Sequence, residues 1–191
     1  MSEEVILRHC APTLAGMKTG SLFSYPASSL QDAAKELGEY AQVFQEAGLC
    51  ALPLTYLKNG RALVYVYRPQ MLERDLAGEL QAEILKSCGY GSLERENCIR
   101  TLIRHLQEGD GFPHEIGLFL GYPPEDVKGF IENRGEHAKY TGTWKVYGNL
   151  EESLAQFARF QRCTRAYVEA GRRGVGLRRL AVRRTGNRQK A

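Results

Sequence analysis

Long apolar runs are missing from this sequence. No stretch approaches the roughly 18 residues that a membrane-crossing helix needs, so we expect no transmembrane segment. The first residues, Met1 to Val5, also lack the basic region and the long apolar stretch of a secretory signal. A chain of 191 residues is long enough to bury one core without disulfides or metals. We therefore expect one soluble domain in the cytoplasm.

Cysteine pairs at metal-binding spacing are also absent. The five cysteines are scattered, odd in number and never arranged as CxxC: Cys10, Cys50, Cys88, Cys98 and Cys163. Without an export signal they are expected to be reduced thiols and not disulfide partners. The missing paired spacing argues against a structural zinc site. We predict no metal site on this basis.

Acidic residues are missing from the segment that begins at Gly171. This segment holds eight Lys and Arg residues and therefore carries a charge of +8. Because the net charge of the whole chain is only +4, the preceding residues carry 4 − 8 = −4 and are mildly acidic. Basic arms of this kind bind nucleic acid electrostatically. The glycines of the segment and its lack of aromatic rings favour a flexible, solubilising tail instead. We predict a domain over residues 1–170 and a flexible basic tail over 171–191, with nucleic-acid binding through Arg172 to Lys190 as the less favoured alternative.

Helix signals recur along the chain. Pro12 suits the first position of a helix, and it predicts a helix over about residues 12–23. Ser28 and Gln31 form a capping-box pattern ahead of apolar residues that recur at helical spacing until Gly48. This pattern predicts an amphipathic helix.

Further helices follow in the second half of the sequence. Pro69 opens a pattern with apolar residues at every fourth position up to Gly89, and Ser92 starts another. Asn149 and Glu152 have the spacing of a cap that begins a long final helix. Each of these segments is predicted to bury one apolar face.

Strand signals are fewer. The segment 49–69 holds two apolar runs joined by Lys58-Asn59-Gly60-Arg61, and Asn-Gly predicts a β-hairpin with a tight type I′ turn. Ile116 to Leu120 reads as a short buried strand that leads into a helix started by Pro123 and Pro124, and residues 141–149 read as another strand. About four strands and six helices without regular βαβ alternation indicate the α+β class, with a small and mainly antiparallel sheet.

Four motifs carry a family resemblance. They are "HCAPTLAGMKTGSLFSY" (9–25), "RALVYVYRP" (61–69), "FPHEIGLFLGYPPEDVKGFIENRG" (112–135) and "WKVYGN" (144–149). Together they resemble domain of unknown function family 3793, a bacterial family, over nearly everything up to Ala170. The resemblance brings no activity, fold or active site with it. Some members are encoded near flavodoxin-type and iron-handling genes, which implies an iron- or redox-linked context.

One reading of the residues is enzymatic. In papain-like hydrolases a cysteine at a helix N-terminus, where the macrodipole favours the thiolate, precedes a histidine by about a hundred residues. Cys10 before Pro12 and His114 before Ile116 follow this order. Cys10 would attack and His114 would act as the base of a thiol hydrolase or transferase. The alternative is a buried cysteine and a hydrogen-bonded structural histidine.

Two other readings are noncatalytic. In the first, His9, Cys10, His114 and Glu115 are ligands for iron, zinc or haem, although adjacent residues seldom both reach one metal. In the second, a neutral or cationic small molecule binds beside Gly117, Gly121 and the free N–H groups beyond Tyr122, with Trp144 lining the pocket. The same glycine and aromatic residues would otherwise serve packing.

We therefore expect an iron- or redox-linked accessory protein or a small-ligand-binding protein. Its site would lie around His9, Cys10, His114 and Glu115, with further contacts from Gly121, Tyr122 and Trp144. The cofactor is unknown at this stage, and the partner is an unidentified small molecule or protein.

Overall fold

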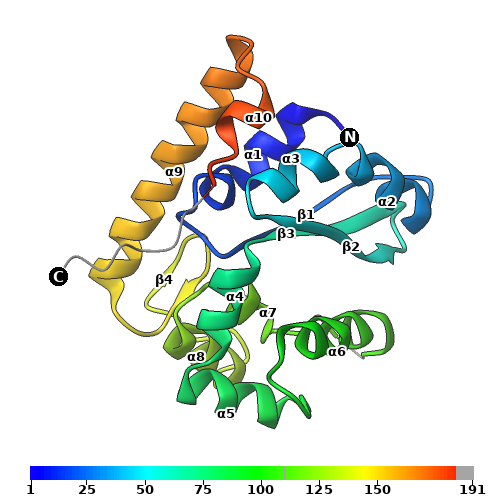
Figure 1. Ribbon diagram of the computed structural model, residues 1–191. Coiled ribbons are helices and arrows are strands. Elements are labelled where there is room, and N and C mark those ends of the chain that lie inside the picture. Colours follow the sequence, from blue (N-terminus) through cyan, green and yellow to red (C-terminus); the bar gives the residue numbers. More distant parts are fainter. Residues whose placement is uncertain (110, 184–191) are drawn as a thin grey trace, which may run out of the picture.

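A three-stranded antiparallel sheet crosses the middle of the molecule, with helices on both of its faces (Figure 1). The computed structural model describes residues 1–109 and 111–183. The strands are β1 (Gly20–Pro26), β2 (Cys50–Leu57) and β3 (Arg61–Tyr67), in the spatial order β1-β3-β2. β3 is therefore the central strand, and both of its neighbours run antiparallel to it.

The predicted hairpin is confirmed, because β2 and β3 pair directly across residues 58–60. Its turn is not the predicted type I′, because Gly60 (φ 73°) is the turn's one residue with positive φ among the described residues. The amide of Gly60 donates to the carbonyl of Leu57 at 3.1 Å. A three-residue loop with glycine in the left-handed region closes an antiparallel pair without requiring a second residue at positive φ.

The residues of β3 alternate between two apolar cores. Leu63, Tyr65 and Tyr67 belong to the core on one face of the sheet, whereas Ala62, Val64 and Val66 belong to the core on the other. Successive side chains of a strand point to opposite faces, so a continuous apolar run is what a strand buried on both faces requires. The sheet is thus the middle layer of three.

The first helical layer combines the beginning and the end of the chain. It contains α1 (Glu3–Leu14), α2 (Leu30–Gly38), α3 (Ala41–Glu46), α9 (Leu150–Arg172) and α10 (Leu177–Leu180). In Figure 1, α9 runs along one side of the molecule beside α1. A Cβ added at Gly171 of α9 would lie 2.5 Å from Cδ1 of Leu7, which shows how closely these two helices approach. Asn149 caps α9 by accepting a hydrogen bond from the amide of Glu152 at 3.2 Å, as predicted.

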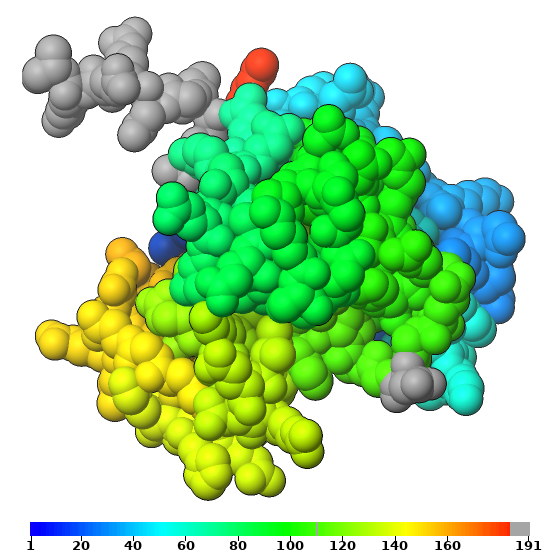
Figure 2. All heavy atoms as spheres, turned by 90° about the horizontal axis from the view of Figure 1, so that it is seen from below, coloured from blue at the N-terminus to red at the C-terminus, as the bar shows by residue number. Residues whose placement is uncertain are grey.

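The second layer covers the opposite face of the sheet. It contains α4 (Pro69–Leu76), α5 (Glu79–Ser87), α6 (Arg95–Glu108), α7 (Ile116–Phe119) and α8 (Pro124–Glu132), followed by a small hairpin of β4 (Tyr140–Thr141) and β5 (Lys145–Val146). Figure 2 views this layer from below, with the segment around α4 to α6 in green beside the yellow-green segment around α8 and the small hairpin. The candidate site described below lies in this second segment.

Several predicted boundaries are wrong. The helix expected over residues 12–23 is instead the end of α1, which contains Pro12, followed by strand β1. The helix expected from residue 28 to Gly48 is divided between Gly38 and Ala41, and the one from Pro69 to Gly89 is divided at residues 77–78. Residues 20–26 form a strand because they pair with β3. The pattern of apolar residues along the chain gives no information about this pairing partner.

The strand expected at Ile116 to Leu120 is also wrong, because residues 116–119 form the one-turn helix α7. The strand expected over residues 141–149 is reduced to two paired residues on each side of a turn. The α+β class with an antiparallel sheet is nevertheless confirmed. The described residues form ten helices and five strands.

Residues 171–183, expected to belong to the flexible tail, are folded onto α1. Leu177 is fully buried in the core that contains residues of α1. The amide of Val182 donates to the carbonyl of Leu14 at 3.0 Å. Residues 184–191, the other part of the expected tail, lie outside the described residues. Among residues 1–109 and 111–183, no helix has the length and apolar content needed to cross a membrane.

Arg68 joins the two ends of the chain to the sheet. Its side chain is 3% exposed. The guanidinium donates to the carbonyls of Thr13 (2.7 Å), Leu14 (2.7 Å), Ala47 (3.2 Å) and Val182 (2.7 Å). A planar fork with five N–H donors can serve several carbonyls at once. Arg68 therefore holds the ends of α1 and α3 and the segment after α10 in fixed positions relative to β3.

Candidate ligand-binding pocket

Five rings surround an apolar pocket of about 290 Å³ next to α7, α8 and β5. The rings belong to Phe112, His114, Tyr122, Phe130 and Trp144. Ile116, Gly117 and Val127 supply further apolar lining, and Asp126 and Lys145 complete it. Apolar pockets with aromatic walls and few polar groups are the usual form of a small-molecule site.

The rings form two groups. Tyr122 and Trp144 stack with centroids 4.8 Å apart and planes at 30°. Phe157 closes the other side of Trp144 in an edge-to-face contact at 4.4 Å. His114 and Phe130 have centroids 4.7 Å apart with planes at 56°. Such geometries are the favourable ones for aromatic pairs, so the pocket walls are fixed by contacts among the rings themselves.

Asp126 fixes the position of the indole. Its carboxylate is buried, and Oδ2 accepts a hydrogen bond from Nε1 of Trp144 at 2.6 Å. Oδ1 accepts from the backbone amides of Tyr147 and Gly148, both at 2.7 Å. Three donors on one carboxylate compensate for its burial. Asp126, which the sequence predicted only as part of a helix start, therefore links α8 to the segment of β5 and orients the Trp144 wall of the pocket.

Gly117 permits a close approach of α7 to its neighbours at the pocket wall. A Cβ at Gly117 would lie 2.7 Å from Cγ2 of Val127 and 3.2 Å from Cδ2 of Tyr122. Real Cβ atoms essentially never approach another atom to 2.7 Å, so any larger residue would displace these neighbours. The glycine therefore lets α7 lie directly against Val127 of α8.

Lys145 places one positive charge at the pocket. Its Nζ lies 5.8 Å from the centroid of the Phe130 ring and donates to the carbonyl of Gly135 at 2.6 Å. Cations are attracted to the face of an aromatic ring. Because a resident ammonium already occupies this place, the pocket disfavours a second cation and suits a neutral ring.

Three of the predicted site residues come together in this pocket, namely His114, Tyr122 and Trp144. Gly121 lies next to it but has a structural reason to be glycine, because its φ is 70°. A Cβ there would also lie 2.8 Å from Oγ1 of Thr19. This glycine therefore forms the turn between α7 and α8.

Glu115 points away from the pocket into the neighbouring core. Its Oε1 accepts a hydrogen bond from the hydroxyl of Tyr90 at 3.1 Å and lies 2.9 Å from Nδ1 of His105. The residue is 5% exposed. A carboxylate with these two partners links α6 to the start of α7. Burial and the nearby Glu115 carboxylate together raise the pKa of Tyr90 far above its usual value.

Cys10 lies within α1 and is fully buried. Burial raises the pKa of its thiol to about 12. The nucleophile in cysteine chemistry is the thiolate, so this environment keeps Cys10 unreactive. Cys10 belongs to the core between α1 and the sheet, whereas His114 packs on Phe130 of α8.

His9 lies one residue earlier on α1 and stacks on Phe23 with a centroid separation of 4.9 Å. It lines a second pocket, of about 430 Å³, between α1, β1 and α9. Burial and the nearby Arg8 and Arg61 lower the pKa of His9. Across residues 1–109 and 111–183, no group of three or more His, Cys, Asp or Glu side chains is placed to hold a metal ion.

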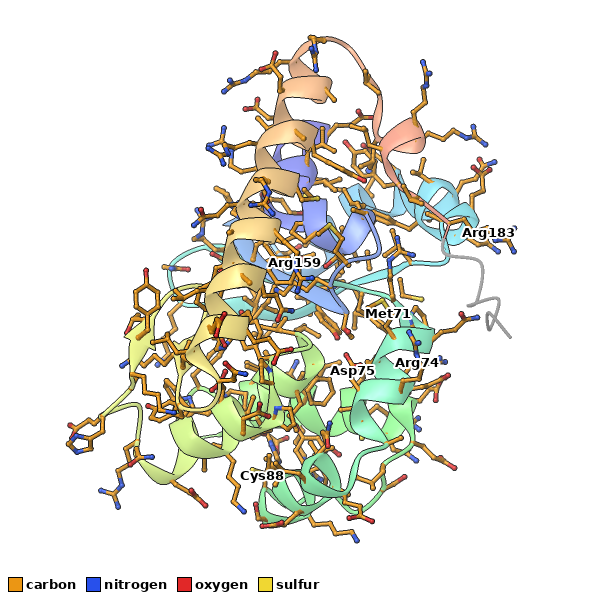
Figure 3. All side chains as sticks on the ribbon, turned by 90° about the vertical axis from the view of Figure 1, so that its left-hand side faces the viewer. Met71, Arg74, Asp75, Cys88, Arg159 and Arg183 are labelled. Atoms are coloured by element: carbon orange, nitrogen blue, oxygen red, sulfur yellow. The ribbon has the colours of Figure 1, made fainter. Side chains whose placement is uncertain are left out.

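A third and larger hollow, of about 1200 Å³, lies between α2, α3, β2 and α4. Met71, Arg74 and Arg183 border it, and Figure 3 shows Arg74 on α4 below Arg183. On the same helix Asp75, also labelled in Figure 3, accepts a hydrogen bond from the hydroxyl of Thr19. This contact anchors the segment between α1 and β1 to α4.

Gly117 was predicted, together with Gly121, to let a ligand approach closely, and it lines the pocket. Sequence patterns gave no indication of Phe112 or Phe130 as pocket residues, nor of Lys18 in the second pocket. Both rings belong to the motif at 112–135, in which aromatic residues flank glycines. A pattern that is read as a strand puts His114 and Ile116 on one face, whereas the actual turn and short helix place the rings around a cavity.

The chain was compared with known families and proteins. The model of the family described as "Protein of unknown function (DUF3793)" matches residues 6–181. No curated protein and no solved structure matches the chain.

Proposed function

The chain belongs to the DUF3793 family, and we propose from the geometry of its aromatic pocket that it is a binding protein for a small, neutral, planar ligand. The observation that carries this proposal is the set of five rings around one apolar space of about 290 Å³. Aromatic walls favour a flat ring over a saturated one of the same size by roughly 0.5–1.5 kcal/mol per good ring contact.

The size of the pocket limits the ligand. Pockets for drug-sized molecules span about 300–1,000 Å³, so this pocket suits a compound with one or two rings. Ile116, Gly117 and Val127 offer apolar contacts, and the Lys145 ammonium disfavours a cation. The half-exposed ring of Phe112 lies at the surface and would cover a bound ligand.

Trp144 provides a direct test, because it is the protein's single tryptophan and lines the pocket. The experiment titrates the protein with benzyl alcohol and with cyclohexylmethanol, which carry the same alcohol on a flat and on a saturated ring. We expect benzyl alcohol to change the Trp144 emission at saturation. We expect cyclohexylmethanol to bind at least about twofold more weakly, which corresponds to the lower end of the ring-contact advantage.

Two variants locate the binding. Phe130→Leu removes a wall ring but keeps an apolar side chain, and it should weaken benzyl alcohol binding severalfold. Tyr140→Leu removes an exposed ring that contacts Phe157 and does not line the pocket, and it should bind like the parent. Equal affinity of Phe130→Leu and the parent, or an emission of Trp144 that does not respond to either alcohol, would contradict the proposal.

A further inference from the structure

The pocket next to α1 and α9 has a chemical character opposite to that of the aromatic pocket. Its volume is about 430 Å³, and its lining includes Lys18, Thr143, Gln161, Thr164 and Arg165. Each of these side chains can donate hydrogen bonds. Of the described residues that line it, none is acidic.

Lys18 is the central group. It is only partly exposed, and its Nζ lies 5.1 Å from the centroid of the Tyr122 ring. Within residues 1–109 and 111–183, no carboxylate lies within ion-pair distance of this ammonium. Burial lowers the pKa of Lys18 to about 8, because the partly desolvated ammonium is less favourable than it is in water. A bound anion would offset this desolvation cost.

Arg165 adds a second positive charge from the facing helix α9, and it too takes part in none of the ion pairs formed among residues 1–109 and 111–183. Two cations from different elements, together with hydroxyl and amide donors in the same lining, match the several acceptor oxygens of a phosphate group better than the two of a carboxylate.

We propose that this pocket, which we call the Lys18 pocket, is a binding site for a phosphate group, with Lys18 and Arg165 as its cationic ligands. The site is separate from the aromatic pocket, although Thr143 of one and Trp144 of the other are neighbours in the chain. The phosphate group would be free inorganic phosphate or the phosphate of a small phosphomonoester.

The test is calorimetric titration of the full chain at constant ionic strength and neutral pH, with inorganic phosphate, glycerol 3-phosphate and acetate. Phosphate or glycerol 3-phosphate should bind at least tenfold more tightly than acetate, and the tighter of the two identifies the source of the group. Either of two results would overturn the proposal. In the first, acetate binds as tightly as phosphate. In the second, phosphate shows no binding at about 10 mM, which corresponds to negligible affinity.

Three variants assign the site. Lys18→Met keeps the apolar stem and removes the charge, and it should weaken phosphate binding at least tenfold. Arg165→Met changes an exposed residue, so its folding is not at risk, and it should weaken binding at least threefold. Lys35→Met, at an exposed position of α2, is the matched control and should bind like the parent. Unchanged affinity in both pocket variants would overturn the assignment.

A second measurement needs no variant. Acetic anhydride modifies neutral lysine amines, and bound phosphate should slow the acetylation of Lys18 severalfold while leaving Lys35 unaffected, as followed by peptide mass spectrometry. Equal acetylation of Lys18 with and without saturating phosphate would overturn the proposal.

Discussion

The indole of Trp144 is held by the carboxylate of Asp126 at 2.6 Å, and the same carboxylate accepts hydrogen bonds from two backbone amides of the segment after β5. One buried acid therefore positions both a pocket wall and the strand that carries it. The shape of the aromatic pocket therefore depends on a carboxylate whose two oxygens both accept hydrogen bonds from the protein itself.

Replacing Asp126 by Asn should destabilise the protein by about 2 kcal/mol, because an amide cannot accept three hydrogen bonds as a carboxylate does and adds unmatched donors. Urea unfolding followed by circular dichroism measures this loss. The Trp144 emission should also change, because the indole loses its charged acceptor. Glu125→Gln, at the exposed neighbouring position, is the control and should unfold like the parent. Equal midpoints for both variants would contradict the role assigned to Asp126.

The turn at Gly121 offers a paired prediction with Gly38. Gly121→Ala should cost more than about 1 kcal/mol, because the residue has φ 70° and a Cβ would contact Thr19. Gly38 ends α2, and a Cβ there meets nothing within 4 Å. Gly38→Ala should therefore be neutral or stabilising by up to about 1 kcal/mol. Thermal unfolding of both variants decides the matter, and a tolerant Gly121→Ala would show that its conformation does not require glycine.

Cys10 should influence stability at high pH. The pKa of its thiol is about 12 in the folded protein, against a usual 9.0. The contribution of the neutral thiol to the free energy of unfolding is therefore fully present below pH 9 and is lost as the pH rises toward 12. Cys10→Ala should be less stable than the parent by ~1 kcal/mol at pH 8. That difference should shrink by up to about 1.4 kcal/mol per pH unit above pH 9. A difference that is constant with pH would contradict the raised pKa.

The same burial predicts the reactivity of Cys10. Native protein treated with iodoacetamide at pH 8 should remain unmodified at Cys10, whereas half-buried Cys50 serves as the accessible reference. Unfolding in urea should make the two thiols react alike. Peptide mass spectrometry measures the labelling of both thiols. Rapid labelling of Cys10 in the native protein would contradict this prediction and would again favour Cys10 as a nucleophile.

Arg68→Lys should destabilise the protein by about 2–4 kcal/mol, although the charge is kept. A lysine ammonium cannot reach four carbonyls from separate segments in the way a guanidinium fork does. Arg74→Lys is the control, because Arg74 is exposed on α4 and its guanidinium donates to the carbonyl of Gln70 in the same helix. Denaturant midpoints that fall equally in both variants would count against the bridging role.

The sequence predicts those elements whose signals are local. The hairpin around Asn59-Gly60, the cap at Asn149 and the helix begun by Pro124 follow from turn or capping chemistry within a few residues. The apolar run at 116–120 carries no such signal, because a short run without periodicity fits a strand and a buried helical turn equally well. Strand β1 was missed because its partner, β3, lies 35 residues further along the chain even at the nearest register pair, Pro26 with Arg61 (61 − 26).

The candidate site was predictable only in part. His114, Tyr122 and Trp144 were named from a motif, and the structure places all three at one pocket. Their companions Phe112 and Phe130 depend on the direction of α7 and α8, which no spacing along the chain reveals. Cys10 and His9 illustrate the reverse case. Adjacent in sequence to each other, they lie on α1 in different surroundings from those of His114.

The contact between α1 and α9 has a consequence for synthesis on the ribosome. Helix α1 leaves the exit tunnel long before α9, the helix on which it packs, and Arg68 leaves it long before residue 182, whose carbonyl it binds. The apolar face of α1 therefore stays without its full cover until almost the whole chain has been translated. Nascent chains of this kind depend on late contacts of high sequence separation. Premature termination before α9 would therefore leave α1, 136 residues earlier in the chain (150 − 14 = 136), without the helix on which it packs.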